Sequence, residues 1–345
     1  MEELNNPQLR EALRAALRGN FLQRITEFDK SMDAVLSWQW PAEASTKRLA
    51  QPKVSSAFRV LRKGADSFLE LAESFLDDSY APNRPGTAGD KFLNYYLPLM
   101  WFSTPDWEIG ASYFRYRADG NSAKFLGAVK GFMIRHSWLL NCQLSFAKKP
   151  SHNLWHAFSS LGLDSVDHAC TNLNLMVDLN CVPRDQRFGT LYQVVASLAS
   201  FGGPDYPMLT RPVKDSWFNL IRCAVAAILA HDSEALSQSL GDLYKAHRRK
   251  HNIPWDAHTA FPDVSLIATF LERIARGRNV EYEPPKADCR DEVLILSSIG
   301  EPHSDFCFLP GGHLMLEPYE SSQSWLTALV GEAVSVTTEH RLYAT

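Results

Sequence analysis

The apolar residues of the chain recur at spacings of three and four over most of its length, which places them on one face of an α-helix. Gly, Pro, Asp and Ser residues interrupt these segments and supply candidate caps. On this pattern we predict helices over 9–17, 21–36, 54–75, 122–146, 151–161, 164–179, 189–201, 217–230, 234–251 and 263–276. The aromatic segment 108–116 fits either a helix or a strand. The chain is therefore predicted to be mainly α, as a multi-helix bundle or as stacked helical pairs.

The pattern changes in the last sixty residues. Continuous apolar runs at 293–299 and 306–309 are typical of strands, and a glycine pair follows the second run as a turn signal. We therefore predict a helical body over 1–285 with a candidate sub-boundary near 202–214, and a small mixed α/β appendage over 286–345.

Composition and charge narrow the function classes. The 345 residues are 45% hydrophobic and 21% charged, which is typical of a globular chain with a substantial core. A formal net charge of −4 provides no strong positive field, so we expect no nucleic-acid partner. The first residues lack the basic and apolar regions of a signal peptide, and the longest apolar run, 217–230, is too short for a membrane span. We therefore expect a cytoplasmic protein with no membrane association.

The cysteines indicate neither a disulfide framework nor a zinc site. The six residues are scattered and form no CxxC pair. We expect buried free thiols in a reducing compartment.

Two histidine pairs have a spacing of four, which puts both members on one helical face, as half of a metal site requires. His152 and His156 lack the intervening glutamate of a metalloprotease motif. His247 and His251 lie in a run of basic residues, whose charge disfavours a cation. The basic run 245–251 has two interpretations, an RNA or phosphate site and a solvated helix end. We favour the helix end, because positive charge there complements the helix dipole. We expect no metal ion.

Other chemical signatures are weak or absent. The sequence contains no phosphate-binding GxxxxGK[ST] loop, no GxGxxG motif and no GxSxG elbow. Asp77 and Asp78 are adjacent and would not face each other on a helix, so they make a poor acid–base pair. Tyrosines and arginines alternate at 113–117, as on some nucleic-acid surfaces, but a half-buried amphipathic segment explains them equally well. We expect no catalytic residue, no cofactor and no enzymatic activity.

One family resemblance bears on function, and it rests on residues 217–283. An apolar helix led by Trp217 ends in Ala-Ala-Ile-Leu-Ala-His-Asp, and the next helix closes on Leu-Tyr-Lys-Ala-His-Arg-Arg-Lys-His. A loop with Asp256, Phe261 and Asp263 follows, and then Leu-Ile-Ala-Thr-Phe-Leu-Glu-Arg-Ile-Ala-Arg-Gly-Arg-Asn-Val-Glu-Tyr-Glu. This order resembles the C-terminal half of the Immunity protein 49 family, and the region after Asp291 departs from that family's pattern.

The resemblance implies a helical bacterial immunity protein that binds and neutralises a cognate polymorphic toxin by stoichiometric occlusion. The family has no catalytic motif, so the resemblance assigns no site residues. Two other hypotheses remain open: a helical-repeat adaptor that binds peptides in a groove, and a helical enzyme whose site is assembled from distant residues. The first candidates for such an enzyme are His136, Asp167, His168 and Arg187.

Overall fold

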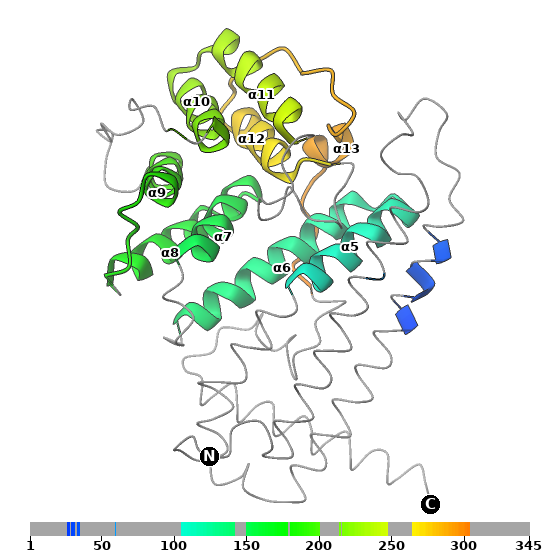
Figure 1. The fold of residues 1–345 in the computed structure, drawn as a ribbon. Helices are drawn as coiled ribbons and strands as arrows, with labels where there is room; N and C mark the ends of the chain where they lie inside the picture. Colours follow the sequence, from blue (N-terminus) through cyan, green and yellow to red (C-terminus); the bar gives the residue numbers. More distant parts are fainter. Residues whose placement is uncertain are drawn as a thin grey trace, which may run out of the picture.

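The structure, a computed structural model of the chain, describes residues 105–141, 150–178, 180–200, 214, 216–247 and 264–303, with isolated helical positions at 26, 27, 29–31, 33, 34 and 59. In these ranges the regular elements are all α-helices, so the mainly α class is confirmed for this part of the chain (Figure 1). The helices are α5 (Pro105–Asp119), α6 (Ser122–Asn141), α7 (Pro150–Gly162), α8 (Val166–Asp178), α9 (Gln186–Leu198), α10 (Ser216–Ala230), α11 (Ser233–His247), α12 (Leu266–Gly277) and α13 (Glu292–Leu296).

Helices that are consecutive in the sequence pack as pairs. The closest pairs are α5 with α6, α7 with α8, and α10 with α11, and a short connection joins the two helices of each pair. Helix α9 bridges α7 and α10, and α12 packs against α7, α10, α11 and α13. Figure 1 accordingly shows α12 enclosed by its neighbours in the upper part of the molecule.

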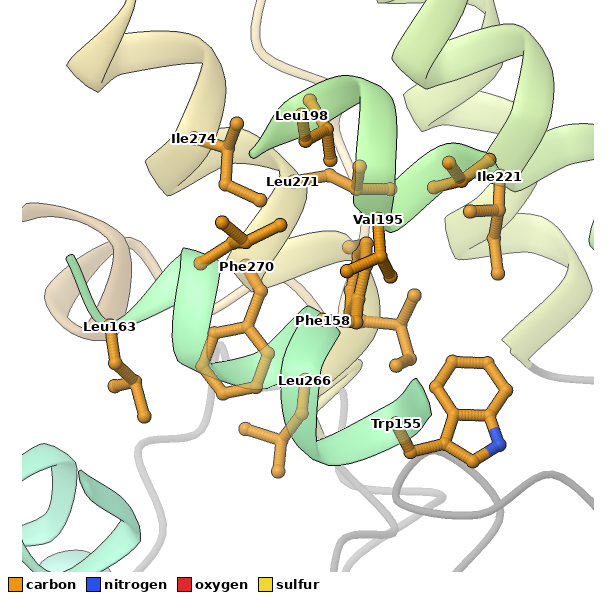
Figure 2. Packing of buried hydrophobic residues seen from close by; sticks show 14 of the residues in the cluster. Trp155, Phe158, Leu163, Val195, Leu198, Ile221, Leu266, Phe270, Leu271 and Ile274 are labelled. Carbon is orange, nitrogen blue, oxygen red and sulfur yellow. The ribbon is translucent and has the colours of Figure 1, made fainter. Parts of the chain in front are cut away.

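Helix α12 is the buried centre of this arrangement. Residues 266–275 are all buried, including the charged side chains of Glu272 and Arg273. Its apolar residues meet α7, α9 and α10 in the cluster drawn in Figure 2. Gly162 lies directly against the Phe270 side chain, and an added Cβ there would overlap the ring. Helices α7 and α12 therefore depend on this glycine for their close approach.

The helix ends use an unusual set of residues. Asp164, Asn180, Ser200, His231 and Asn279 have φ between 48° and 55° and follow α7, α8, α9, α10 and α12. At α10, the Asp232 amide donates to the Ala227 carbonyl at 2.9 Å, as in a Schellman motif. At the end of α12, Gly277 is the last helical residue, and Asn279 rather than this glycine takes the left-handed conformation.

Because a side chain with a Cβ is strained at positive φ, His231→Gly is expected to raise the free energy of unfolding by about 0.5–1 kcal/mol. His231 is exposed, so the substitution removes little packing. Urea denaturation followed by circular dichroism measures the change. Asn174→Gly, on the exposed surface of α8, is the control and should lower stability by about 0.3 kcal/mol. A loss of stability in both variants would contradict the expectation.

The strand predicted over 293–299 is wrong. Residues 292–296 form the short helix α13, and 298–303 have no regular secondary structure. Asp291 starts the helix, since its side chain accepts from the Leu294 amide at 3.1 Å. A short apolar run without periodicity does not distinguish a strand from a buried helical turn. Here the cap at Asp291 and the packing against α12 and α6 favour the helix.

The segment after α13 crosses α6 at two glycines. A Cβ at Gly127 would come within 2.5 Å of the Glu301 carbonyl oxygen, and one at Gly131 would overlap the backbone of His303. The Gly300 amide donates to the Ala123 carbonyl at 3.0 Å. The beginning of the predicted appendage is thus packed directly on the helical body.

Several sequence predictions have a defined outcome and others lie outside the described residues. The ambiguous segment 108–116 is helical, within α5. Helix α12 begins at Leu266 with Ser265 as its N-cap rather than at Asp263. Within the predicted helix 21–36, positions 26, 27, 29–31, 33 and 34 are described and are helical. The helix over 9–17, the helix over 54–75 apart from residue 59, the sub-boundary near 202–214 apart from residue 214, and the appendage after 303 lie outside the described part. Cys170, Cys181 and Cys223 are partly buried free thiols and Cys289 is a fully buried one.

Candidate functional site

The buried helix α12 carries two adjacent charged residues, and each of them requires polar partners from the surrounding elements. Glu272 has no exposed surface and Arg273 is 8% exposed. Consecutive residues on a helix point in directions about 100° apart, so the two side chains do not pair with each other. Because burying an unpaired charge is costly, each must find partners in a different neighbouring element.

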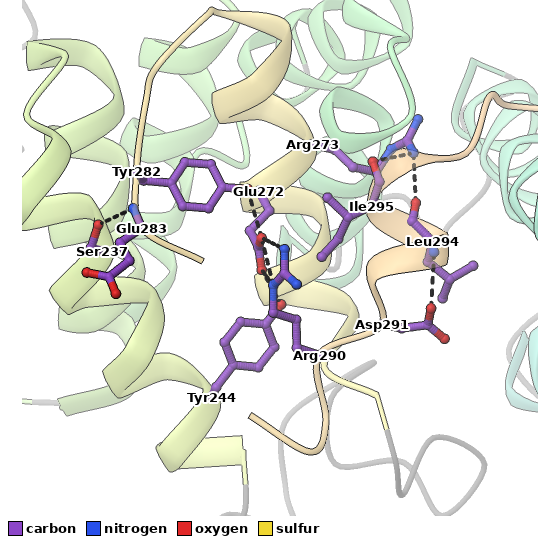
Figure 3. A network of polar contacts seen from close by, with 10 residues as sticks. All are labelled: Ser237, Tyr244, Glu272, Arg273, Tyr282, Glu283, Arg290, Asp291, Leu294 and Ile295. Carbon is purple, nitrogen blue, oxygen red and sulfur yellow. Dashed lines mark hydrogen bonds and ion pairs between the residues drawn. The ribbon is translucent and has the colours of Figure 1, made fainter. Parts of the chain in front are cut away.

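Glu272 is held by three residues, which together with it form the Glu272 clasp: Tyr244, Tyr282 and Arg290. The Arg290 Nη2 atom donates to Glu272 Oε2 at 2.8 Å, and its Nε lies 3.0 Å from both carboxylate oxygens. The Tyr244 hydroxyl donates to Oε1 at 2.6 Å and the Tyr282 hydroxyl to Oε2 at 2.8 Å. Figure 3 shows both phenols and the guanidinium converging on this carboxylate. The clasp ties α11 and the segment 280–291 to α12.

The electrostatics of the clasp follow from its burial. Burial, followed by the negative charge of Glu272, raises the pKa of Tyr244 well above its ordinary value. The same two causes, in the same order, raise the pKa of Tyr282. Burial disfavours the charged form of Arg290, but its hydrogen bonds and attraction to Glu272 outweigh this, so its pKa is raised. Both phenols therefore stay protonated as donors to a charged carboxylate.

Above about pH 10 the free energy of unfolding is expected to fall steeply, because tyrosine titrates near 10 in an unfolded chain. The folded protein holds both phenolic protons more tightly, so their stabilisation is complete below about pH 10. It is lost as the pH rises through the higher folded values, with a slope of about 1.4 kcal/mol per pH unit for each phenol. Urea denaturation at a series of alkaline pH values measures the slope. It should flatten in a variant with Tyr244→Phe and Tyr282→Phe, and an unchanged slope would contradict the assignment.

Arg273 points to the other side of α12 and binds backbone carbonyls. Its Nε donates to the Gly162 carbonyl at 2.8 Å, and its Nη1 donates to the Leu294 and Ser297 carbonyls, each at 2.8 Å. These carbonyls belong to the C-terminal ends of α7 and α13, where helical partners are missing. Asp164 lies 3.7 Å from Nη2 with an exposed carboxylate. Arg273 therefore closes two helix ends and has a structural role.

An open hollow lies between α11 and the segment 283–287, and we call it the α11 groove. It has a volume of about 950 Å³ and is open to solvent. Glu234, Gln238, Gly241 and Lys245, at spacings of four, three and four, form its floor along one face of α11. Its volume is within the range of about 300–1,000 Å³ that is typical of ligand sites.

The opposite wall of the α11 groove runs parallel to the helix. The Glu283 amide donates to the Ser237 hydroxyl at 2.8 Å, and further along, the Cys289 thiol lies 3.6 Å from the Tyr244 carbonyl. Tyr244 lines the groove with part of its surface while its hydroxyl belongs to the clasp. The clasp therefore links the two walls of the groove, and Figure 3 shows the Ser237–Glu283 hydrogen bond together with the clasp residues.

The candidates for an assembled catalytic site occupy separate positions. Asp167 is exposed and His168 is partly buried in the first turn of α8, while Arg187 is exposed in the first turn of α9. Burial, then the charge of Lys130, lowers the pKa of His168, and Asp167 opposes this shift. His136 lies in α6, but its side chain is outside the described part. No contact described here brings these residues to one centre.

The histidine pairs have individual structural surroundings. His156 is buried, with its Nδ1 3.1 Å from the Met133 sulfur and its ring 5.2 Å from that of Phe132. His247 is buried at the end of α11, whereas the His152 side chain and His251 lie outside the described residues. Among the residues that the structure describes, no cluster of three or more His, Cys, Asp or Glu side chains is arranged to hold a metal ion.

The aromatic residues at 113–116 form part of the core rather than a stacking surface, and Arg115 and Arg117 are half-buried beside them. Tyr113 and Tyr116 are 1% and 5% exposed, and the ring of Tyr116 stacks on Phe125 at 5.8 Å. Asp291 accepts from the Tyr116 hydroxyl at 2.9 Å and from Arg117 at 3.3 Å. The alternating pattern is therefore explained by an amphipathic helix with inward tyrosines.

Sequence reasoning did not identify the Glu272 clasp or the α11 groove. The available signal was the pair Glu272-Arg273 inside the apolar sequence Leu-Ile-Ala-Thr-Phe-Leu-Glu-Arg-Ile-Ala. A helix that is apolar all round is buried, and charges inside it require partners. The identity of those partners depends on how residues 280–291 return across α11 and α12, which the sequence pattern does not specify.

The helices of the described part do not include one that is long and apolar enough to span a bilayer. No family model, curated protein or solved structure matches the chain.

Proposed function

We propose that this chain is a protein-binding scaffold that acts as a bacterial immunity protein and neutralises a cognate toxin by stoichiometric occlusion. The observation that carries the proposal is the contrast between the Glu272 clasp and the α11 groove. The buried charges of the clasp are bonded to one another and serve the fold, whereas the open groove presents charged and polar side chains to solvent. Such a groove suits recognition of a partner surface.

The resemblance to the Immunity protein 49 family supports the choice of a toxin as the partner. The resembling residues, 217–283, supply α10, α11, α12 and the start of the groove wall. The proposed binding surface and the resemblance thus fall on the same part of the chain. The overall negative charge would favour association with a basic toxin domain.

Co-expression of the full chain with the toxic product of an adjacent gene tests the proposal. Cells that make the toxic domain alone should stop growing, and cells that also make this chain should grow normally. The two proteins should then co-purify in equal amounts. Growth arrest that the chain does not relieve, or the absence of binding to every adjacent gene product, would overturn the immunity proposal.

A peptide-binding adaptor is the second candidate, and the α11 groove is the observation that favours it. An adaptor would bind short peptides through the groove without neutralising a toxin. Growth protection separates the two functions, since only an immunity protein prevents arrest.

A further inference from the structure

The two ends of the α11 groove carry opposite charges. Asp232 and Glu234 lie at the end where α11 begins, with Glu283 on the facing wall beside Ser237, and Lys245 lies at the end where the helix finishes. Asp232 also caps the helix, since its Oδ1 accepts from the Ala235 amide at 3.0 Å. Lys245 pairs with Asp242 at 3.1 Å but remains 71% exposed, so this surface pair is weak and can exchange partners.

Gly241 lies in the floor between these ends and has no structural explanation within the described residues. It is an interior residue of α11, where glycine is less favourable than alanine. A Cβ added there would meet no described atom within 4 Å, so close packing does not require a glycine. A glycine in an open groove does permit another backbone to approach the helix closely.

From these two observations we infer that the α11 groove binds an extended segment of a protein partner, seated over Gly241 with opposite charges toward its two ends. A Lys or Arg of that segment lies near Glu234 and Glu283, and a carboxylate lies near Lys245. This inference rests on the proposed function, because the segment belongs to the partner that the chain neutralises. The spacing of the groove charges selects the segment, and the bare backbone at Gly241 provides the contact at its centre.

The probe for a test is a phage-displayed library of random linear peptides, selected on the full-length chain. Enriched peptides are expected to carry a basic and an acidic residue separated along the sequence. A synthetic copy of an enriched peptide is then titrated against the chain by fluorescence anisotropy. Failure to enrich peptides above a control without the protein would overturn the inference.

Gly241→Trp is the decisive variant. The indole fills the floor where the structure has open space, so the unfolding temperature should stay at or above that of the original chain. Binding of the selected peptide should weaken about tenfold or more. Asn174→Trp on the exposed surface of α8 is the matched control and should bind normally. Equal binding by Gly241→Trp and the original chain would overturn the inference.

A charge exchange tests the orientation of the segment. Glu234→Lys should weaken binding of the selected peptide, and a peptide whose basic residue is replaced by Glu should recover affinity for this variant but not for the original chain. Lack of any effect of Glu234→Lys would overturn the assigned orientation and with it the inference.

The growth assay separates this inference from the proposed function. If Gly241→Trp loses the peptide but still protects cells fully, the groove inference fails while the immunity function stands. If the groove binds peptides as described but the chain protects against no adjacent toxin, the immunity function fails and the groove remains.

Discussion

Arg290→Met is expected to lower the free energy of unfolding by about 3–5 kcal/mol, because it leaves the Glu272 carboxylate buried without a countercharge. Glu272 has no exposed surface, and the arginine supplies its only positive charge among the described residues, through contacts of 2.8 and 3.0 Å. The tyrosine hydroxyls remain as donors, but two neutral donors do not replace a bidentate guanidinium. Urea denaturation followed by circular dichroism measures the loss.

The double variant Glu272→Gln with Arg290→Met separates charge burial from general damage. A neutral amide in place of the carboxylate removes the uncompensated charge while it keeps an acceptor for a tyrosine hydroxyl. We expect the double variant to recover more than half of the stability lost in Arg290→Met. If Arg290→Met alone costs less than about 1 kcal/mol, or if the double variant is the less stable of the two, the description of the clasp is wrong.

Arg273→Met is expected to have a comparable effect, a loss of about 3–5 kcal/mol. Its guanidinium donates to the carbonyls of Gly162, Leu294 and Ser297, each at 2.8 Å. A hydrogen bond to a charged group contributes about 1.5–3 kcal/mol, and a buried carbonyl left without a donor adds a desolvation cost. The loss should be accompanied by faster hydrogen exchange in α13, since the variant frees the C-terminal end of that helix from α12.

Arg276→Met provides the matched control, as Arg276 is on the same helix and exposed. This substitution should change the free energy of unfolding by no more than about 0.5 kcal/mol. Equal effects at Arg273 and Arg276 would show that the carbonyl contacts contribute little and would contradict the assigned role of Arg273.

The helical body was predictable because its determinants are local. The spacing of apolar residues predicted a helix over 234–251, and in α11 Leu236, Leu240 and Leu243 form the buried face while Asp232 caps the first turn. The aromatic residues near Tyr113 left the helix–strand choice open, since they suit either element when read alone. Their inward packing on Phe125 settles it through tertiary contacts.

The candidate site was less predictable because its partners are distant in sequence. Tyr244 and Glu272 are 28 residues apart, and Arg290 lies 18 residues beyond Glu272. Nothing in the periodicity specifies that the segment 280–291 turns back along α11. The incorrect prediction of a strand over 293–299 has the same cause, because the conformation of α13 depends on its contacts with the distant helices α12 and α6.

Calorimetric titration of the purified full chain with the purified domain of an adjacent toxin tests the central claim most directly. A scaffold that acts by occlusion should give saturable one-to-one binding, and the toxin's activity should fall in proportion to the chain added until both are equal. Binding that is absent, or saturable binding that leaves the toxin fully active, would contradict the claim.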